Sequence, residues 1–298
     1  MRDFAGKTAV VTGAASGIGF ALAERFAAAR MQVVLADIQK DALDRAVEKL
    51  EAKQAGVIGV VADTMQKASV QALAERAISA FGKIHILCNN AGVASTRNAV
   101  GTGIWEVPDE DWRWVLGVNL HGVVHGLQAF VPHMLAHGEE GHIVNTASLA
   151  GLLPGGGTYG VSKHGVVALT ETLCNDLRVR NAKLGASVLC PGMVSTNIID
   201  AERNRPVELK HERGALSEEM RAEELRAMGR AALAAGKAPS EIAEIVFRAI
   251  EENNVYILPH PAWDDFLKRR FDAILTRKGP AVIDLNEMMQ RRAKGEQF

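Results

Sequence analysis

Short runs of β-branched residues alternate with longer helical segments along most of the chain. Apolar runs of this kind are typical of strands that are buried on both faces of a parallel sheet. Because strands joined through helices require right-handed crossovers, the alternation predicts an α/β fold in a single domain. We expect a Rossmann-type, doubly wound parallel sheet of seven strands, at residues 8–12, 33–36, 58–61, 84–88, 142–146, 186–190 and 255–258. The predicted helices are residues 17–29, 41–52, 69–81, 109–137, 159–183 and 240–252.

One segment interrupts this alternation near the carboxyl edge of the predicted sheet. Residues 193–237 lie between the sixth strand and the last crossover helix, and they contain amphipathic stretches at 198–214 and 217–235. A segment of this length is more often a functional element than a passive loop, so we expect it to form a helical substrate lid.

The tail of the chain also carries an amphipathic pattern, over residues 263–277. We expect this helix to dock on the protein itself or on a second subunit rather than on a membrane. The predicted organisation is a dinucleotide-binding catalytic domain over residues 1–258, which includes the lid, and a C-terminal helical extension over residues 259–298.

Composition and charge exclude several classes of protein. The 298 residues carry a formal net charge of −1, so no overall basic field would attract nucleic acid or an anionic membrane. Cys88, Cys174 and Cys190 include no Cys-x-x-Cys pair, which argues against a disulfide scaffold or a zinc knuckle. No signal-peptide pattern opens the chain, and no apolar run is long enough to cross a membrane. We expect a cytoplasmic protein that acts on a small molecule and binds neither nucleic acid nor a membrane.

A glycine-rich turn follows the first predicted strand and opens the first predicted helix. Glycines allow a tight turn and let the backbone approach a pyrophosphate, which then lies at the helix N-terminus. The spacing is Gly-x-x-x-Gly-x-Gly, and its position between a strand and a helix is the one that a dinucleotide site requires. The residues expected to hold the cofactor here are Gly13, Ser16, Gly17, Ile18 and Gly19.

Asp37 ends the second predicted strand, 18 residues after Gly19. A carboxylate at this position accepts hydrogen bonds from the ribose hydroxyls and repels a 2′-phosphate, so it favours NAD as the cofactor. A solvated loop aspartate is the alternative interpretation. Lys40 lies nearby and leaves an NADP-dependent enzyme open, although neither Ala15 nor Ser16 is basic.

Tyr159 and Lys163 are four residues apart at the start of a predicted helix, which places them on one face. An ammonium group near a phenol favours the phenolate, so we expect Lys163 to lower the pKa of Tyr159 toward a range useful for acid–base catalysis. Such pairs also occur by accident on surfaces. Ser148, at the end of the fifth strand, is placed to hydrogen-bond a substrate oxygen, and Asn119 is a polar residue on an otherwise apolar helix face.

Together these motifs resemble the short-chain dehydrogenase/reductase family over about residues 4–258. The features that carry the likeness are the turn at 12–19, Asp37, Asp63, Asn89, Asn90, Ala91, Gly92, Asn119, Ser148, Tyr159, Lys163 and the Pro-Gly-Met-Val-Ser-Thr sequence at 191–196. The resemblance implies an enzyme that transfers a hydride between NAD and a secondary alcohol or its ketone. The alternatives are an NADP-dependent carbonyl reductase and a cofactor-binding regulator without turnover.

The same resemblance implies roles for individual residues. Tyr159 would exchange the proton with the alcohol oxygen, and Ser148 would orient that oxygen. Lys163 would hold the nicotinamide ribose and lower the pKa of Tyr159, while Asn119 would support a water relay from Lys163. The remaining implied cofactor residues are Asp63 and Thr64 at the adenine, Asn90, Ala91 and Gly92 along the cofactor, Pro191 and Gly192, and Val194 and Thr196 at the carboxamide.

Two features indicate a roomy substrate site. The stretch between Ser148 and Tyr159 is short for the family and contains three successive glycines, whereas the 93–111 loop is long. An apolar and aromatic lining favours a bulky or aromatic substrate. The tail, moreover, is similar to bacterial Cα-dehydrogenases that oxidise benzylic alcohols of aryl ethers. The predicted substrate residues are Ser148, Leu152, Leu153, Met193, Ile198, Ile199 and Trp105.

Four histidines form i, i+4 pairs on the predicted 109–137 helix. His121 with His125, and His133 with His137, are spaced as zinc ligands can be, but no carboxylate or cysteine at metal-ligand spacing accompanies them. We expect no metal site and place these histidines at a subunit interface or in solvent. In the family this helix and the 159–183 helix pair across a two-fold axis, which implies a homodimer or homotetramer.

Overall fold

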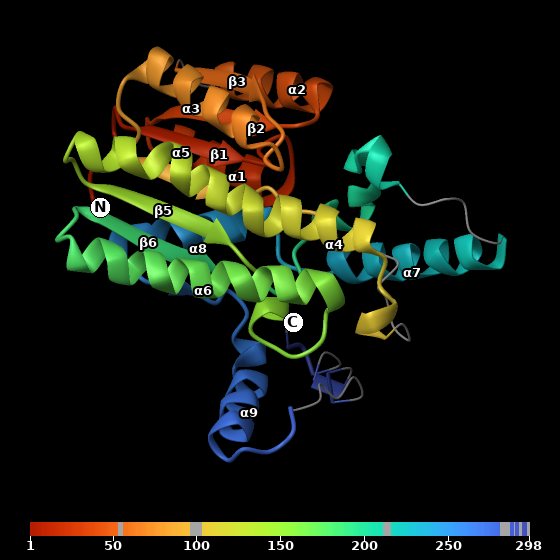
Figure 1. The fold of residues 1–298 in the computed structure, drawn as a ribbon. Helices are drawn as coiled ribbons and strands as arrows, with labels where there is room; N and C mark the ends of the chain where they lie inside the picture. Colours follow the sequence, from red (N-terminus) through yellow and green to blue (C-terminus); the bar gives the residue numbers. More distant parts are fainter. Residues whose placement is uncertain are drawn as a thin grey trace.

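The computed structural model describes residues 1–52, 56–95, 103–210, 216–280, 287–288, 290–291 and 294–296; of residues 216–222 it describes the backbone alone. Its centre is a seven-stranded parallel sheet in the order β3-β2-β1-β4-β5-β6-β7 (Figure 1). The predicted doubly wound sheet is therefore confirmed. The strands are β1 (Thr8–Thr12), β2 (Gln32–Asp37), β3 (Val57–Val61), β4 (Ile86–Asn89), β5 (Gly141–Thr146), β6 (Leu184–Leu189) and β7 (Tyr256–Ile257).

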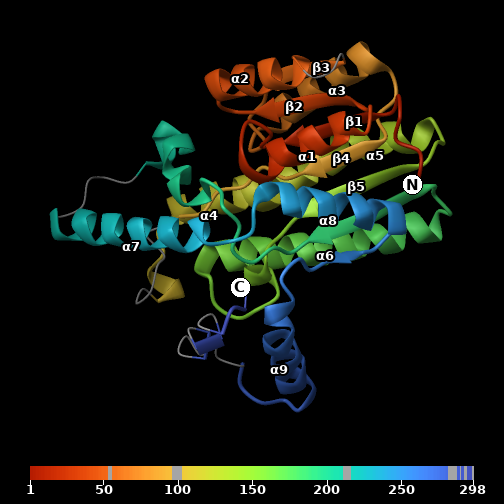
Figure 2. The ribbon, with the colours of Figure 1, turned by 180° about the vertical axis from the view of Figure 1, so that it is seen from behind.

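Helices cover both faces of the sheet. One face carries α1 (Gly17–Ala28), α2 (Lys40–Glu51) and α8 (Pro239–Glu252), as the view from behind shows (Figure 2). The other face carries α3 (Lys67–Phe81), α4 (Asp109–Leu116), α5 (Gly122–Ala136) and α6 (Gly157–Val179) (Figure 1). Within the described part of the chain, no helix is both long enough and apolar enough to cross a membrane.

The predicted 109–137 helix is not continuous. A π-helical turn at Gly117–His121 separates α4 from α5, and the fully buried Asn119 lies within it. Such turns insert an extra residue into the helical ladder and occur frequently at functional sites. The periodicity of the sequence does not reveal the extra residue, because apolar positions continue on both sides of it.

The expectation that every strand is buried on both faces is wrong at the two edges of the sheet. In β3, Val61 is 52% exposed, and in β7, Tyr256 is 52% exposed. Each of these strands has a neighbour on one side only, so helices cover it less completely.

The lid begins with short 3₁₀ turns at Ile198–Asn204 and Val207–Leu209, and it continues into α7 (Leu216–Ala234). The expected amphipathic stretch at 198–214 is thus not one helix, and its end at 211–214 lies outside the described residues. A buried ion pair holds the base of the lid, because Arg205 Nη2 lies 2.5 Å from Asp111 Oδ1. The Arg205 guanidinium also stacks over the Trp114 ring at 4.0 Å. Beyond this base, α7 projects from the body of the protein (Figure 1).

The C-terminal extension forms a 3₁₀ turn at Pro261–Trp263 and then α9 (Asp264–Leu275). Phe266 and Leu267 are buried in a cluster with residues of the 149–153 segment, so the start of the extension docks on its own chain. The second half of the predicted apolar stripe does not, because Ile274 and Leu275 are 56% and 73% exposed.

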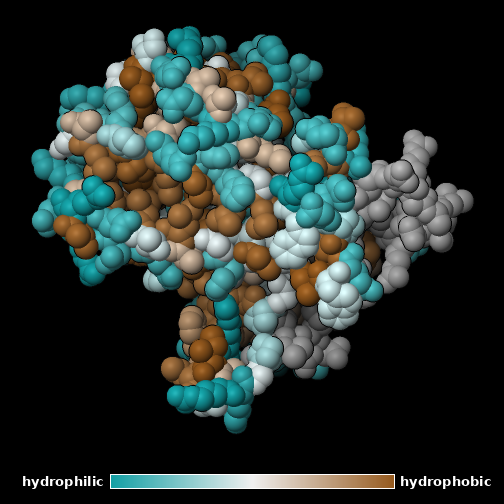
Figure 3. Space-filling view, in the orientation of Figure 1, coloured by the Kyte–Doolittle hydropathy of each residue, from teal (hydrophilic) through white to brown (hydrophobic). Residues whose placement is uncertain are grey.

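Apolar side chains gather on the surface of the α5 and α6 face (Figure 3). Val161 and Val179 of α6 are 49% and 72% exposed, and Leu169 and Leu173 are only partly buried. From α5, Leu127 contributes to the same face. This is the face that the family resemblance places between subunits.

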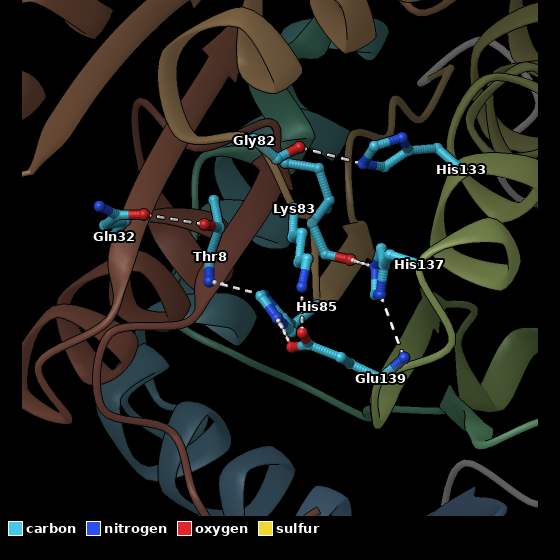
Figure 4. Close-up of polar contacts among 9 residues, drawn as sticks. Thr8, Gln32, Gly82, Lys83, His85, His133, His137 and Glu139 are labelled. Atoms are coloured by element: carbon cyan, nitrogen blue, oxygen red, sulfur yellow. Dashed lines mark hydrogen bonds and ion pairs between the residues drawn. The ribbon is translucent and has the colours of Figure 1, made fainter.

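At the amino edge of the sheet, three histidines form hydrogen bonds between neighbouring segments (Figure 4). His85 Nδ1 accepts a hydrogen bond from the Thr8 amide at 3.1 Å, and His85 Nε2 bonds to Glu139. His133 and His137 bond through Nε2 to the carbonyl oxygens of Gly82 and Ile84, respectively. His133 and His137 therefore tie the end of α5 to the segment before β4, and both remain partly exposed. Their place at a subunit interface or in solvent stays a prediction.

The other two histidines of the pairs lie further toward the start of α5. His121 is exposed, whereas His125 Nδ1 bonds to the Thr64 carbonyl oxygen at 3.0 Å. Among the described residues, no group of three histidine, cysteine or acidic side chains is arranged to hold a metal ion.

His142 predicts a specific response of the fold to acid. It is buried, its Nε2 lies 2.7 Å from the Ser187 hydroxyl, and burial lowers its pKa to about 3. The unfolded chain binds a proton at this residue below about pH 6.5, and the folded chain does not, so stability falls as pH decreases from 6.5 toward 3. One such histidine costs about 2 kcal/mol between pH 6.5 and 5.

We therefore expect His142→Asn to flatten the loss of stability between pH 6.5 and 5, whatever its effect at pH 7. Thermal or urea unfolding at several pH values, followed by circular dichroism, measures the slope. An equal slope in the variant would show that other groups cause the acid sensitivity.

Candidate active site

A cleft of about 520 Å³ lies at the carboxyl edge of the sheet. Its walls include residues that directly follow β1, β4, β5 and β6, which is where a doubly wound sheet binds its ligand. The predicted cofactor residues that line it are Gly13, Ser16, Gly17, Ile18, Asp37, Asp63, Thr64, Asn90, Ala91, Gly92, Tyr159, Lys163, Pro191, Gly192, Val194 and Thr196.

The glycine-rich turn packs directly against the loop that follows β4. Gly13 has a φ of +65°, and a Cβ on it would lie 2.9 Å from the Ala91 Cα. Gly19 does not line the cleft, because it is buried under the turn, where a Cβ would lie 2.2 Å from the Gly13 carbonyl oxygen. Both positions therefore require glycine, and no side chain at either position obstructs the turn.

Asp37 is fixed at one end of the cleft. Its Oδ2 accepts a hydrogen bond from the Ala15 amide and its Oδ1 accepts one from the Gln39 amide, both at 3.0 Å. Lys40 does not join it, because its ammonium group bonds to Asp44 at 2.5 Å. The negative charge of Asp37 thus faces the cleft without a neutralising partner from Lys40.

Asp63 and Thr64 line the same end of the cleft, after β3. The Asp63 carboxylate accepts a hydrogen bond from the Met65 amide at 2.9 Å, and the Asp63 amide donates to the Ser69 hydroxyl at 3.0 Å. These local bonds fix the loop independently of a ligand.

Ser148, Tyr159 and Lys163 meet in the cleft from two elements, the end of β5 and the first turns of α6. Lys163 Nζ donates a hydrogen bond to the Thr146 carbonyl oxygen at 2.8 Å and lies 5.6 Å from the centre of the Tyr159 ring. Burial lowers the pKa of Lys163 to about 8.

The pKa of Tyr159 differs from the expectation. Burial raises it to about 12, and a hydrogen bond with Ser148 offsets part of that effect. Desolvation of the phenolate is thus the largest influence on the pKa of Tyr159. The phenol is neutral at pH 7.

Asn119 reaches the site indirectly. Its Oδ1 accepts from the Val93 amide at 2.8 Å, and its Nδ2 donates to the Val93 carbonyl oxygen and to the Ser162 hydroxyl. It is fully buried and does not line the cleft. A Cβ on Gly92 would lie 3.3 Å from Lys163 Nζ and 3.4 Å from Asn119 Oδ1, so both atoms border the space beside Gly92. The water relay between them stays a prediction.

The predicted substrate residues divide into two groups. Those that line the cleft are Ser148, Leu153, Met193, Ile198 and Ile199. Trp105 is 84% exposed on the 3₁₀ turn Ile104–Glu106, outside the cleft, and Leu152 points into a core cluster. Residues 96–102 of the long 93–111 loop lie outside the described part of the chain.

The cleft also contains residues that the sequence does not indicate, and Trp263 is one of them. Trp263 lines the cleft although it belongs to the C-terminal extension, where helical spacing assigns it to a docking stripe. Its position in the sequence could have indicated this. Trp263 follows the last strand by only six residues, and the chain leaves that strand at the carboxyl edge of the sheet.

A family model described as short chain dehydrogenase matches residues 7–206. The chain belongs to the short-chain dehydrogenase family. This dehydrogenase is therefore an oxidoreductase that works with a nicotinamide dinucleotide, as the sequence predicts.

Three relatives match this dehydrogenase over nearly its whole length. A crystal structure of a short chain dehydrogenase/reductase from Burkholderia phymatum, in complex with NAD, is 45% identical, with a TM-score of 0.88 over 95% of this chain and 99% of that one. The CLA biosynthesis dehydrogenase/reductase of Lactiplantibacillus plantarum is 33% identical over 97% of this chain and 100% of its own length. The C alpha-dehydrogenase of Sphingobium sp. strain SYK-6 is 33% identical over 98% of this chain and 92% of its own. The predicted likeness to Cα-dehydrogenases is thus confirmed.

The geometry predicts the effect of removing the Tyr159 hydroxyl. Tyr159→Phe keeps the ring but removes the transferable proton, so kcat should fall by about 10²–10⁴ while the affinity for NADH stays within a small factor. Steady-state kinetics and fluorescence titration with NADH measure the two quantities. Tyr256→Phe is the matched control, because Tyr256 is the second tyrosine of the chain and bonds to Glu171 outside the cleft. Near-normal turnover in Tyr159→Phe would mean that another group moves the proton.

Proposed function

We propose that this dehydrogenase transfers a hydride between NAD and a bulky secondary alcohol or its ketone, with Tyr159 as the general acid and base. The observation that carries the proposal is that Ser148, Tyr159 and Lys163 line one cleft together with Asp37. An intact set of this kind also speaks against a regulator without turnover.

The residues of the cleft fit a dinucleotide. Because Gly13 and Gly19 have no side chains, the glycine-rich turn leaves room for a pyrophosphate at the N-terminus of α1. Each carboxylate oxygen of Asp37 accepts a single backbone hydrogen bond, so lone pairs remain for ribose hydroxyls. The bound nicotinamide supplies the hydride acceptor or donor, which no side chain can provide.

The side chains of the protein manage the proton. In the reduction direction, the neutral Tyr159 phenol donates its proton to the substrate oxygen, and the Ser148 hydroxyl beside it orients that oxygen. In the oxidation direction, the phenolate takes the proton back. Lys163 is close enough to stabilise the phenolate, and its own bond to Thr146 fixes the direction of its side chain.

The preference for NAD depends on Asp37. The Burkholderia phymatum relative was solved with NAD, which supports the same cofactor here. Lys40, the residue that favours the NADP alternative, is engaged by Asp44 instead. Asp37→Ala should weaken NAD binding by about tenfold or more and narrow the preference over NADP, since a hydrogen bond to a charged group contributes about 1.5–3 kcal/mol. Comparing kcat/KM for both cofactors, with Asp41→Ala on the outside of α2 as the control, tests this. Equal use of NADP by the unmutated enzyme would refute it.

The proposed substrate carries an aromatic or polycyclic group. Apolar residues line the cleft beside Tyr159, and Gly155 and Gly156 contribute no side chains to that wall. The likeness to the C alpha-dehydrogenase supports a benzylic alcohol. We expect kcat/KM for 1-phenylpropanol to exceed that for 2-butanol by at least tenfold, because a buried phenyl ring gains more than 1.5 kcal/mol over a short alkyl group. If 2-butanol is the equal substrate, the large-pocket interpretation is wrong.

The proposed assembly is a homodimer or homotetramer that covers the α5 and α6 face (Figure 3). The exposed valines of α6 support it, because contiguous apolar surface of this kind marks interaction sites. Light scattering should give at least twice the mass of one chain at micromolar concentration, and Val179→Glu should lower the mass. A monomeric wild-type protein would contradict the assembly. We also propose that residues 1–258 form the catalytic domain, with the lid at 193–237.

A further inference from the structure

The chain passes beneath the cleft after it leaves β7. His260, three residues beyond that strand, is 1% exposed, and both of its ring nitrogens contact the segment at 191–194 that lines the cleft. Its Nδ1 accepts a hydrogen bond from the Gly192 amide at 3.1 Å. Its Nε2 donates to the Met193 carbonyl oxygen at 3.0 Å. This donor and acceptor pattern requires the neutral Nε2–H form of the ring.

The environment of His260 favours that neutral form. Burial is the main cause that lowers its pKa, and the positive charge of Lys237 acts in the same direction. The contact with the Met193 carbonyl oxygen and the charge of Glu241 act in the opposite direction but are smaller effects. At pH 7 the ring therefore keeps its acceptor for the Gly192 amide.

The segment at 191–194 is held from two sides. On the lid side, the Lys237 amide donates to the same Met193 carbonyl oxygen at 3.1 Å, and the Ser195 amide donates to the Lys237 carbonyl oxygen at 3.0 Å. On the tail side, His260 supplies the hydrogen bonds. The two rings of the tail also press on Gly192, where a Cβ would lie 3.0 Å from Trp263 Nε1 and 3.2 Å from His260 Cγ.

The tail that carries His260 is itself packed against the body of the protein. Trp263 is 7% exposed, forms part of the cleft wall and packs on Phe266 with ring centres 5.5 Å apart. Phe266 and Leu267 belong to the core cluster that includes Leu149, next to Ser148. The tail thus contacts both sides of the reacting centre, the Ser148 side through the cluster and the Gly192 side through His260.

We propose that His260 is a positioning residue of the active site, which holds the Gly192–Met193 backbone, and with it the adjacent cofactor wall, in the geometry that hydride transfer needs. The C-terminal segment after β7 is then a working part of the catalytic site. The inference rests on the proposed function, since it assigns this wall to the nicotinamide end of the cofactor.

Two substitutions separate the two hydrogen bonds. His260→Asn places an amide oxygen near the position of Nδ1 and keeps an acceptor for the Gly192 amide, whereas His260→Gln places its amide group near Nε2 and keeps a donor to Met193. His260→Ala removes both. The matched control is His142→Ala, because His142 is also 1% exposed and hydrogen-bonded, but its partner Ser187 does not line the cleft, whereas Gly192 and Met193 do.

We expect His260→Ala to lower kcat for 1-phenylpropanol oxidation by roughly tenfold or more, since small displacements of a reacting group have large effects on rate. The affinity for NADH, measured by fluorescence titration, should fall about threefold or more. His260→Asn and His260→Gln should each restore part of the loss in kcat. His142→Ala should lower the melting temperature but leave kcat and NADH affinity within about twofold.

The inference is overturned if His260→Ala lowers the melting temperature like His142→Ala but leaves kcat and NADH affinity unchanged. It is also overturned if neither His260→Asn nor His260→Gln has a higher kcat than His260→Ala. Should His260→Ala fail to fold, the two conservative variants are compared with the unmutated protein instead. A lower kcat or a lower NADH affinity in either variant supports the inference, and unchanged values of both quantities in both variants overturn it. Absence of alcohol turnover in the unmutated protein would refute the proposed function, whereas the NADH titrations of the variants would still test the role of His260.

Discussion

The Thr12 hydroxyl group joins the ends of β1 and β4 at the point where the strand order reverses. It accepts hydrogen bonds from the Asn90 and Ala91 amides at 3.0 and 3.1 Å. The Asn90 side chain then donates to the Thr12 carbonyl oxygen and accepts from the Thr146 hydroxyl, which brings in the end of β5. Because Lys163 donates to the Thr146 carbonyl oxygen, its ammonium group is held by the same network. The glycine-rich turn and the side chain of Lys163 thus share one hydrogen-bond network.

Burial gives this site its chemistry at a cost. Lys163 is buried and Tyr159 is partly buried, and desolvation moves their pKa values in opposite directions, to about 8 and about 12, respectively. Each group therefore favours its neutral form more than it would in water. Burying two such groups lowers the stability of the fold. It favours catalysis, because a charge that develops between them is poorly screened and so interacts strongly with its neighbours.

The sequence predicts the sheet well because strand burial and crossover length are local properties. It predicts Ser148, Tyr159 and Lys163 as a site because Ser148 follows a strand at the carboxyl edge, Tyr159 and Lys163 share a helix face, and the set resembles that of the family. What it misses depends on packing between distant segments. The π-helical turn around Asn119, the outward position of Trp105 and the buried position of Leu152 follow no periodicity. The raised pKa of Tyr159 likewise depends on how much of the protein surrounds it.

The buried pair of Asp111 and Arg205 divides the lid into two mechanically different parts. The base, up to Leu209, packs against α4. The helix α7 is in turn joined to this base, because Arg230 pairs with Asp200 at 2.8 Å. For protein engineering, this makes α7 the part of the lid at which the substrate side of the cleft is best varied, because Ala232 and Leu233 line the cleft and the Asp111–Arg205 pair lies outside this helix.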